Sequence, residues 1–161
     1  MNRVFITSDT HFCHKNIMSY EPEARGHFHS ISEHDEQIIQ NWNETVNPND
    51  TVWHLGDVIF GQENMHLLAR LNGHKKLVLG NHDKYPPEEY LKYFATIHGV
   101  ANLRGCILTH VPVHPAQLAH RYKANVHGHL HSHIIQDKRY FNAGLERSEE
   151  HTSELQSQFR I

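Results

Sequence analysis

The chain has 161 residues, of which 38% are hydrophobic and 20% are charged, and its formal net charge is −3. This composition argues against a disordered polyelectrolyte, a membrane span and a protein that holds nucleic acid mainly by charge. Two cysteines are too few for a disulfide framework. We therefore expect one globular domain with a proper core, and a cytoplasmic location because no signal peptide precedes the run RVFITS.

The predicted elements alternate between strands and helices along the first hundred residues. Residues 4–6 form an apolar strand, and a helix follows between the Ser30–Glu33 capping box and the NPND stop. The runs TVWHLGD, KKLVLGNHD and GCILTH each predict a strand that ends in polar residues, and QENMHLLARLN predicts a second helix. Later short strands are expected at residues 106–109, 124–127, 133–136 and 139–142, with a brief helix near 115–120. This order predicts an α/β fold of layered sheet and helices.

The run NVHGHLHSH, residues 125–133, contains four histidines. A strand would place all four on one face, because side chains repeat every second residue, so their spacing alone cannot choose between them. Gly128 indicates a sharp turn, since glycine permits backbone conformations that other residues avoid. We therefore expect His129 and His131 to follow that turn, with His127 still in the incoming strand.

Five polar clusters follow five of the predicted strands. They are Asp9 with His11, Asp57, Asn81 with His82 and Asp83, His110, and His129 with His131. Each cluster alone is weak, because such short patterns occur by chance in turns and caps. In open α/β sheets the ligand crevice lies outside the carboxyl ends of the strands, so the five together predict one site.

The side chains in these clusters are carboxylates, imidazoles and one amide. Such ligands suit borderline divalent metals, with Mn first and Fe, Ni or Zn as alternatives, and the lack of cysteine argues against a thiolate zinc site. Two such ions about 3.5–4 Å apart need a bridging anionic ligand, and together they can activate a water molecule for an in-line displacement.

In this order the clusters resemble the calcineurin-like metallophosphoesterase family, whose motifs run Asp-x-His, Gly-Asp, Gly-Asn-His-Asp, His and Gly-His-x-His. The runs SDTHFCHKN and WNETVNPNDTVWHLGDV also resemble a small bacterial and phage-type subgroup. The resemblance covers residues 1–146 and implies a single domain with an α/β/β/α sandwich. It also implies that Asp57 bridges two metals. One metal would be completed by Asp9, His11 and His131, and the other by Asn81, His110 and His129.

The resemblance gives the remaining residues of the clusters different roles. His82 would act near the scissile phosphate, as general acid or charge stabiliser, and Asp83 would orient it. We expect His127 and His133 to be structural or to support the ligands, and His54 to be packed and hydrogen-bonded. The role of His14 stays open: it could contact the substrate or cap the helix that follows.

The implied function is hydrolysis of phosphate esters, phosphodiesters first, by a hydroxide that bridges the two metals. A phosphomonoesterase or a nuclease on the same centre stays open, and so does a non-catalytic interaction module that keeps the fold. We expect a small phosphate ester as substrate, rank nucleic acid below it, and expect no membrane partner.

The C-terminal residues differ from the rest of the chain. RSEEHTSELQS, residues 147–157, resembles the in-frame translation of a sequencing-library adapter. We therefore expect residues 147–161 to be a non-native tail that contributes nothing to the site.

Overall fold

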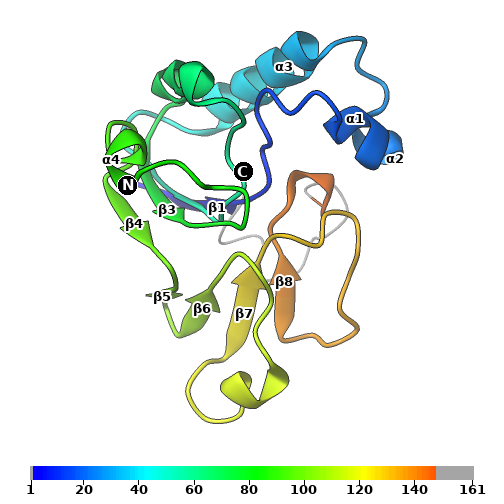
Figure 1. Cartoon of the computed structure of the whole chain (residues 1–161). Coiled ribbons are helices and arrows are strands. Elements are labelled where there is room, and N and C mark those ends of the chain that lie inside the picture. Colours follow the sequence, from blue (N-terminus) through cyan, green and yellow to red (C-terminus); the bar gives the residue numbers. More distant parts are fainter. Residues whose placement is uncertain (1, 148–161) are drawn as a thin grey trace.

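The computed structural model describes residues 2–147, which form a layered α/β fold (Figure 1). In chain order its elements are β1 (Val4–Thr7), α1 (Ile17–Tyr20), α2 (Pro22–Arg25), α3 (Ile31–Thr45), β2 (Thr51–His54), a 3₁₀ helix (Gln62–Arg70), β3 (His74–Val78), α4 (Pro87–Tyr90), β4 (Thr96–His98), β5 (Ala101–Leu103), β6 (Cys106–Leu108), a 3₁₀ helix (Pro115–Leu118), β7 (Ala124–His127), β8 (Tyr140–Asn142) and a 3₁₀ helix (Leu145–Arg147). All of the tail prediction except Arg147 falls outside the described residues.

The strands form two four-stranded sheets, ordered β1-β2-β3-β4 and β5-β6-β7-β8. The first sheet is wholly parallel, and in the second only β5 runs antiparallel to its neighbour. Apolar residues of both sheets, including Ile6 and Trp53 of the first and Leu108 and Val126 of the second, share one core cluster. The predicted α/β class with layered sheets is therefore confirmed.

A second core cluster lies on the other side of the first sheet. Ile39 and Trp42 of α3 and Leu68 of the 3₁₀ helix pack there with Val52 and Leu77 of the sheet. Burial of apolar side chains such as these is the main favourable contribution to folding. The sheet is thus covered by helices on one face and by the second sheet on the other.

The helix α3 begins where the capping box predicts. The Ser30 hydroxyl accepts a hydrogen bond from the Glu33 backbone N–H at 3.1 Å, and the Glu33 carboxylate accepts one from the His29 N–H at 2.8 Å. These bonds satisfy donors that have no partner inside the helix. The first turn is therefore fixed by its own side chains.

Three features differ from the prediction. The predicted helix at residues 62–72 is a 3₁₀ helix, and strands β4 and β5 were not predicted. The strand predicted at residues 133–136 is wrong, because the Asn142 amide donates to the His131 and His133 carbonyls at 2.7 and 3.1 Å. The loop's polar backbone groups are thus satisfied by a side chain instead of a neighbouring strand.

The carboxyl ends of the strands meet at one edge of the sandwich. Ser8, directly after β1, forms an isolated β-bridge with Gly144, which follows β8 in the other sheet. This bridge joins the two sheets where the loops after β1, β2, β3, β6 and β7 emerge. Among residues 2–147, no helix is long and apolar enough to cross a membrane.

Candidate metal centre

The structure brings the seven residues predicted as metal ligands together at this edge. Two groups each offer ligand atoms within 4.8 Å of one another. We call Asp9, His11 and His131 the Asp9 half-site, and we call His110, His129 and Asn81 the His110 half-site. Asp57 groups with His110 and His129 and lies beside both half-sites.

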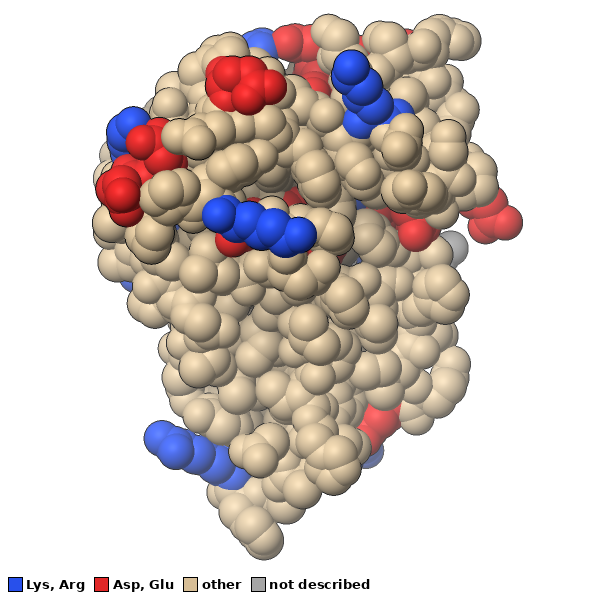
Figure 2. Space-filling model, viewed as in Figure 1, with Lys and Arg blue, Asp and Glu red and all other residues tan. Residues whose placement is uncertain are grey.

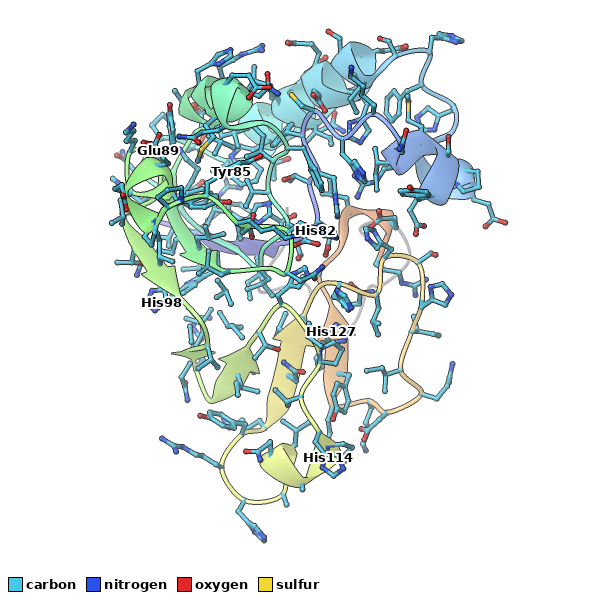
Figure 3. The ribbon with its side chains drawn as sticks, viewed as in Figure 1. His82, Tyr85, Glu89, His98, His114 and His127 are labelled. Carbon is cyan, nitrogen blue, oxygen red and sulfur yellow. The ribbon has the colours of Figure 1, made fainter. Side chains whose placement is uncertain are left out.

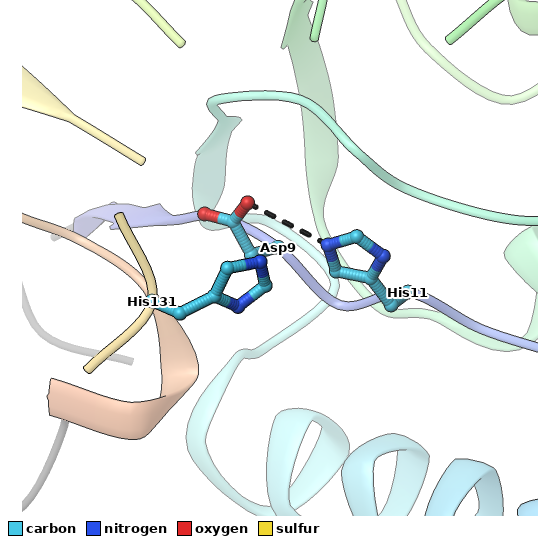
Figure 4. Close-up of side chains that lie close together, drawn as sticks. All are labelled: Asp9, His11 and His131. Carbon is cyan, nitrogen blue, oxygen red and sulfur yellow. Dashed lines mark ion pairs between the residues drawn. The ribbon is translucent and has the colours of Figure 1, made fainter. Parts of the chain in front are cut away.

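In the Asp9 half-site, His11 is buried but makes no hydrogen bond through either ring nitrogen within the described residues. Its Nε2 lies 3.7 Å from Asp9 Oδ1, as Figure 4 shows, and 3.8 Å from Asp57 Oδ2. These separations are too long for hydrogen bonds but leave room for a cation about 2 Å from each atom. Buried polar groups are almost always paired, so the unpartnered imidazole fits a metal ligand.

His131 is oriented by a residue that the sequence prediction missed. Its Nδ1–H donates to Glu146 Oε1 at 3.0 Å, which leaves Nε2 free to bind a cation. A carboxylate behind a ligating histidine is the usual device for fixing its tautomer and ring orientation. Glu146 lies far along the chain in a 3₁₀ helix, and no local motif marks it.

In the His110 half-site, the His110 Nδ1–H donates to the Leu55 carbonyl at 2.7 Å. The other ring nitrogen, Nε2, therefore faces Asn81 Oδ1 at 2.9 Å and Asp57 Oδ2 at 3.3 Å, and His129 Nδ1 lies 3.0 Å from the same amide oxygen. These atoms are mostly acceptors, so a proton or a cation must lie among them. Burial opposes charge on His110, but the Asp57 carboxylate outweighs burial and raises the pKa of the imidazole.

Asp57 lies between the half-sites. The same oxygen, Oδ2, faces His11 on one side and His110 on the other, while Oδ1 accepts the His82 backbone N–H at 2.9 Å. Burial alone would raise the pKa of Asp57, but these imidazoles lower it and keep the carboxylate ionised. This is the place that a bridging carboxylate would occupy, and the bridge itself stays a prediction.

The backbone is strained at the site. Within the described residues, seven non-glycine residues have positive φ, and five of them are predicted ligands: Asp9 (58°), His11 (49°), Asp57 (55°), His129 (68°) and His131 (50°). Such conformations cost about 1–3 kcal/mol each and concentrate at functional sites, where surrounding structure holds them in place. Their coincidence with the predicted ligands indicates a shaped binding site.

The chain turns after Gly128 as predicted, but the glycine is required by space and not by its own backbone conformation. Its φ is not in the left-handed region, but a Cβ there would lie 1.9 Å from Ser8 Oγ and 2.4 Å from Asp9 Oδ2. The close approach lets the His129 backbone N–H donate to Asp9 Oδ2 at 3.0 Å. The loop after β7, which carries His129, is thereby held against Asp9 in the loop after β1.

His82 lies beside the predicted ligands, whereas Asp83 makes different contacts from those expected. His82 stands at the rim with a side chain 43% exposed, its Nε2 4.0 Å from Asp57 Oδ2 (Figure 3). The Asp83 carboxylate accepts backbone N–H bonds from Asp57, Val58 and Gly80 at 2.8 to 3.0 Å. No hydrogen bond between Asp83 and the His82 ring occurs within residues 2–147. Asp83 therefore holds the Asp57 turn and does not orient His82.

The other predicted histidines lie outside the ligand set. His54 is buried, with its ring nitrogens near Thr10 Oγ1 at 3.0 Å and the Gly56 N–H at 3.2 Å, as expected. His127 is the last residue of β7, and it is buried. His14 does not cap a helix; it stacks on Phe60 at 4.1 Å between ring centroids, and burial lowers its pKa to about 4.

Comparison with known proteins gives relatives without an assigned activity. No protein-family model matches the chain. An uncharacterised protein of Methanocaldococcus jannaschii is 30% identical over 156 residues, covering 88% of this chain and 77% of the relative. A protein of unknown function from Aquifex aeolicus has a similar structure, with a TM-score of 0.67, 28% identity and 91% of each chain covered. A Vps29 single mutant from Entamoeba histolytica matches at a TM-score of 0.47 and 17% identity, over 86% of this chain and 72% of that one.

Proposed function

The chain belongs to the same family as the uncharacterised Methanocaldococcus jannaschii protein, and we propose that it is a metal-dependent phosphoesterase with a dinuclear centre. The observation that carries the proposal is the convergence of the seven predicted ligands, in which the buried His11 imidazole has no hydrogen-bond partner among residues 2–147. Phosphodiesters are the preferred substrates in this proposal. The motif resemblance to calcineurin-like metallophosphoesterases supports the reaction class.

The proposal assigns one cation to each half-site and makes Asp57 their common ligand. The mixture of carboxylate, imidazole and amide oxygen favours Mn, with Fe, Ni or Zn as alternatives. Two bound cations would supply an activated water molecule and neutralise charge on the phosphate oxygens. Asp9 and Asp57, both of which keep a lowered pKa despite burial, supply the negative charge that holds the cations.

His82 is the proposed proton donor to the leaving group. It is a half-exposed imidazole at the rim, within 4.0 Å of Asp57 Oδ2, and it belongs to neither group of candidate ligands. From this position its ring can reach an oxygen atom of a phosphate ester bound at the centre, and general acids of this kind act over hydrogen-bond distances. Asp83 contributes indirectly, because it fixes the turn that carries Asp57 and the loop that carries His82.

The surface supports a small substrate over nucleic acid. Figure 2 shows one face of the described residues, on which Lys and Arg side chains are scattered and do not form a continuous patch. A nucleic-acid groove would combine a basic track with stacking aromatic side chains. The net charge of −3 agrees with this preference.

Reconstitution of the chelator-treated protein with MnCl₂ tests the proposal. The loaded protein should hydrolyse bis-nitrophenyl phosphate faster than nitrophenyl phosphate, cyclic nucleotides or single-stranded DNA, and the Mn-free protein should be inactive. Faster turnover of the monoester or of DNA would reassign the substrate class. Binding of two Mn ions without turnover of any substrate would instead favour a non-catalytic interaction module.

A further inference from the structure

Arg25 and Glu146 form a buried ion pair directly behind the Asp9 half-site. The Arg25 guanidinium contacts Glu146 Oε1, and the two side chains are only 4% and 1% exposed. The same Oε1 accepts the His131 Nδ1–H at 3.0 Å. One carboxylate oxygen therefore links a buried cation to a predicted metal ligand.

Arg25 also binds the backbone that carries the other two ligands of this half-site. Its Nη2 donates to the Asp9 carbonyl at 2.6 Å, and its Nη1 donates to the Thr10 carbonyl at 3.1 Å. Asp9 and His11 flank that segment, and both have positive φ. The guanidinium thus holds a strained stretch of backbone in place while Glu146 holds His131.

The contacts continue into α3. Arg25 Nη1 lies 3.2 Å from His34 Nε2, and His34 Nδ1 lies 2.8 Å from Asp35 Oδ1. Asp35 Oδ2 accepts the Cys13 backbone N–H at 2.9 Å, two residues beyond His11. These contacts connect the Arg25–Glu146 pair to α3, the longest helix of the described chain. They also connect α3 to the loop that carries Asp9 and His11.

The His110 half-site has a different support. His110 is held by the Leu55 carbonyl, and the His129 ring contacts the amide of Asn81. Both of these contacts are to uncharged groups, a backbone carbonyl and a side-chain amide. The free energy lost when two charges leave water often exceeds the attraction between them in a buried ion pair. The Arg25–Glu146 pair is therefore expected to have a role other than stability.

We propose that Arg25 and Glu146 are positioning residues that make the Asp9 half-site the tighter of the two metal positions. This inference rests on the proposed function, since it requires that the centre binds metal. The Glu146 carboxylate fixes the His131 tautomer with Nε2 toward the cation and makes that nitrogen more basic. Arg25 holds Asp9 and His11 in the ligand geometry before any cation arrives.

The test is Mn²⁺ titration of the full chain by calorimetry, with Mn electron paramagnetic resonance on the same samples. Glu146→Leu removes the acceptor and should weaken one of the two sites about 10- to 100-fold while leaving the other near its original affinity. The spectrum should then change from a coupled pair to a single Mn ion at low occupancy. Glu146→Gln keeps an oxygen acceptor and should recover part of the affinity.

Glu36→Gln is the matched control, because Glu36 also pairs with an arginine, Arg70, but on the exposed surface away from the ligands. It should leave both affinities unchanged. Circular dichroism of each metal-free variant separates misfolding from loss of a site, and Arg25→Lys, which keeps the charge, repeats the test if Glu146→Leu unfolds. Two unchanged sites in folded Glu146→Leu would overturn the inference, as would equal weakening of both. Absence of Mn²⁺ binding in the unmodified protein would instead defeat the proposed function.

Discussion

The Asp9 and His110 half-sites both face Asp57 Oδ2, but they differ in support and in the exposure of one histidine. Asp9 and His11 are almost fully buried, and a buried ion pair backs the Asp9 half-site. His129 of the other half-site is exposed, and its ring contacts an uncharged amide. Support by buried charges fixes geometry strongly, whereas exposed neutral contacts allow exchange with solvent. The two cation positions should therefore differ in affinity and in rate of exchange.

Substitution of Asp57 should have the largest effect, because its Oδ2 faces His11 in one half-site and His110 in the other. Asp57→Asn keeps the shape but removes the shared negative charge, so Mn²⁺ affinity should fall by more than about 100-fold at both positions, beyond the usual loss for an outer partner. Turnover should fall to background with it. Elemental analysis and a diesterase assay check this, and a variant that keeps two Mn ions and activity would refute the bridging assignment.

Substitution of His82 should separate chemistry from metal binding. His82→Ala should keep both half-sites loaded, since the ring makes no predicted metal bond. Turnover should fall about 10²- to 10⁴-fold on an alkyl or nucleoside ester, because a poor leaving group needs a proton, and only slightly on a nitrophenyl ester. Comparing the two rates at equal Mn content tests this. Equal losses on both esters would indicate electrostatic stabilisation of the phosphoryl oxygens instead.

A methyl group at Gly128 should damage the Asp9 half-site selectively. The Cβ of Gly128→Ala would overlap Ser8 and Asp9, which should cost roughly 1–3 kcal/mol of unfolding free energy as overpacking does. Mn²⁺ binding at the Asp9 half-site should weaken more than at the His110 half-site. Gly99→Ala is the control, because nothing lies within 4 Å of its added Cβ. Equal denaturation midpoints for the two variants would contradict the close approach.

The smallest expected effect is a dependence of stability on pH that comes from His54. The His54 ring contacts Thr10 and Gly56, which are neighbours in sequence of the predicted ligands. Burial lowers its pKa to about 3, whereas the unfolded chain protonates this ring near its ordinary value of about 6.5. The unfolded state thus binds more protons below that value, so stability falls as pH falls.

Between pH 7 and 5.5 this group should remove about 1 kcal/mol of unfolding free energy from the metal-free protein. Urea titrations of the unmodified protein and of His54→Gln at both pH values measure it. The difference between the two proteins should shrink at the lower pH, and a constant difference would show that His54 is protonated in the folded state.

The sequence predicts the parts of this molecule that depend on local pattern. The α3 cap and the five strand-end clusters could be predicted, because capping and the parallel-sheet rule act over short stretches. The loop at residues 133–136 could not, because its backbone is satisfied by the distant Asn142 amide. Arg25 and Glu146 were missed for the same reason. Their pairing spans most of the chain, and nothing near either residue marks it as buried.

Diffraction from Mn-soaked crystals, with anomalous data collected at the manganese edge, tests the central claim most directly. The account predicts two anomalous peaks about 3.5–4 Å apart, on either side of Asp57 Oδ2, one within ligand distance of His11 and one within ligand distance of His110. The peak beside His11 should keep the higher occupancy when the soak is diluted. A single peak, or two peaks that do not share Asp57, would contradict it.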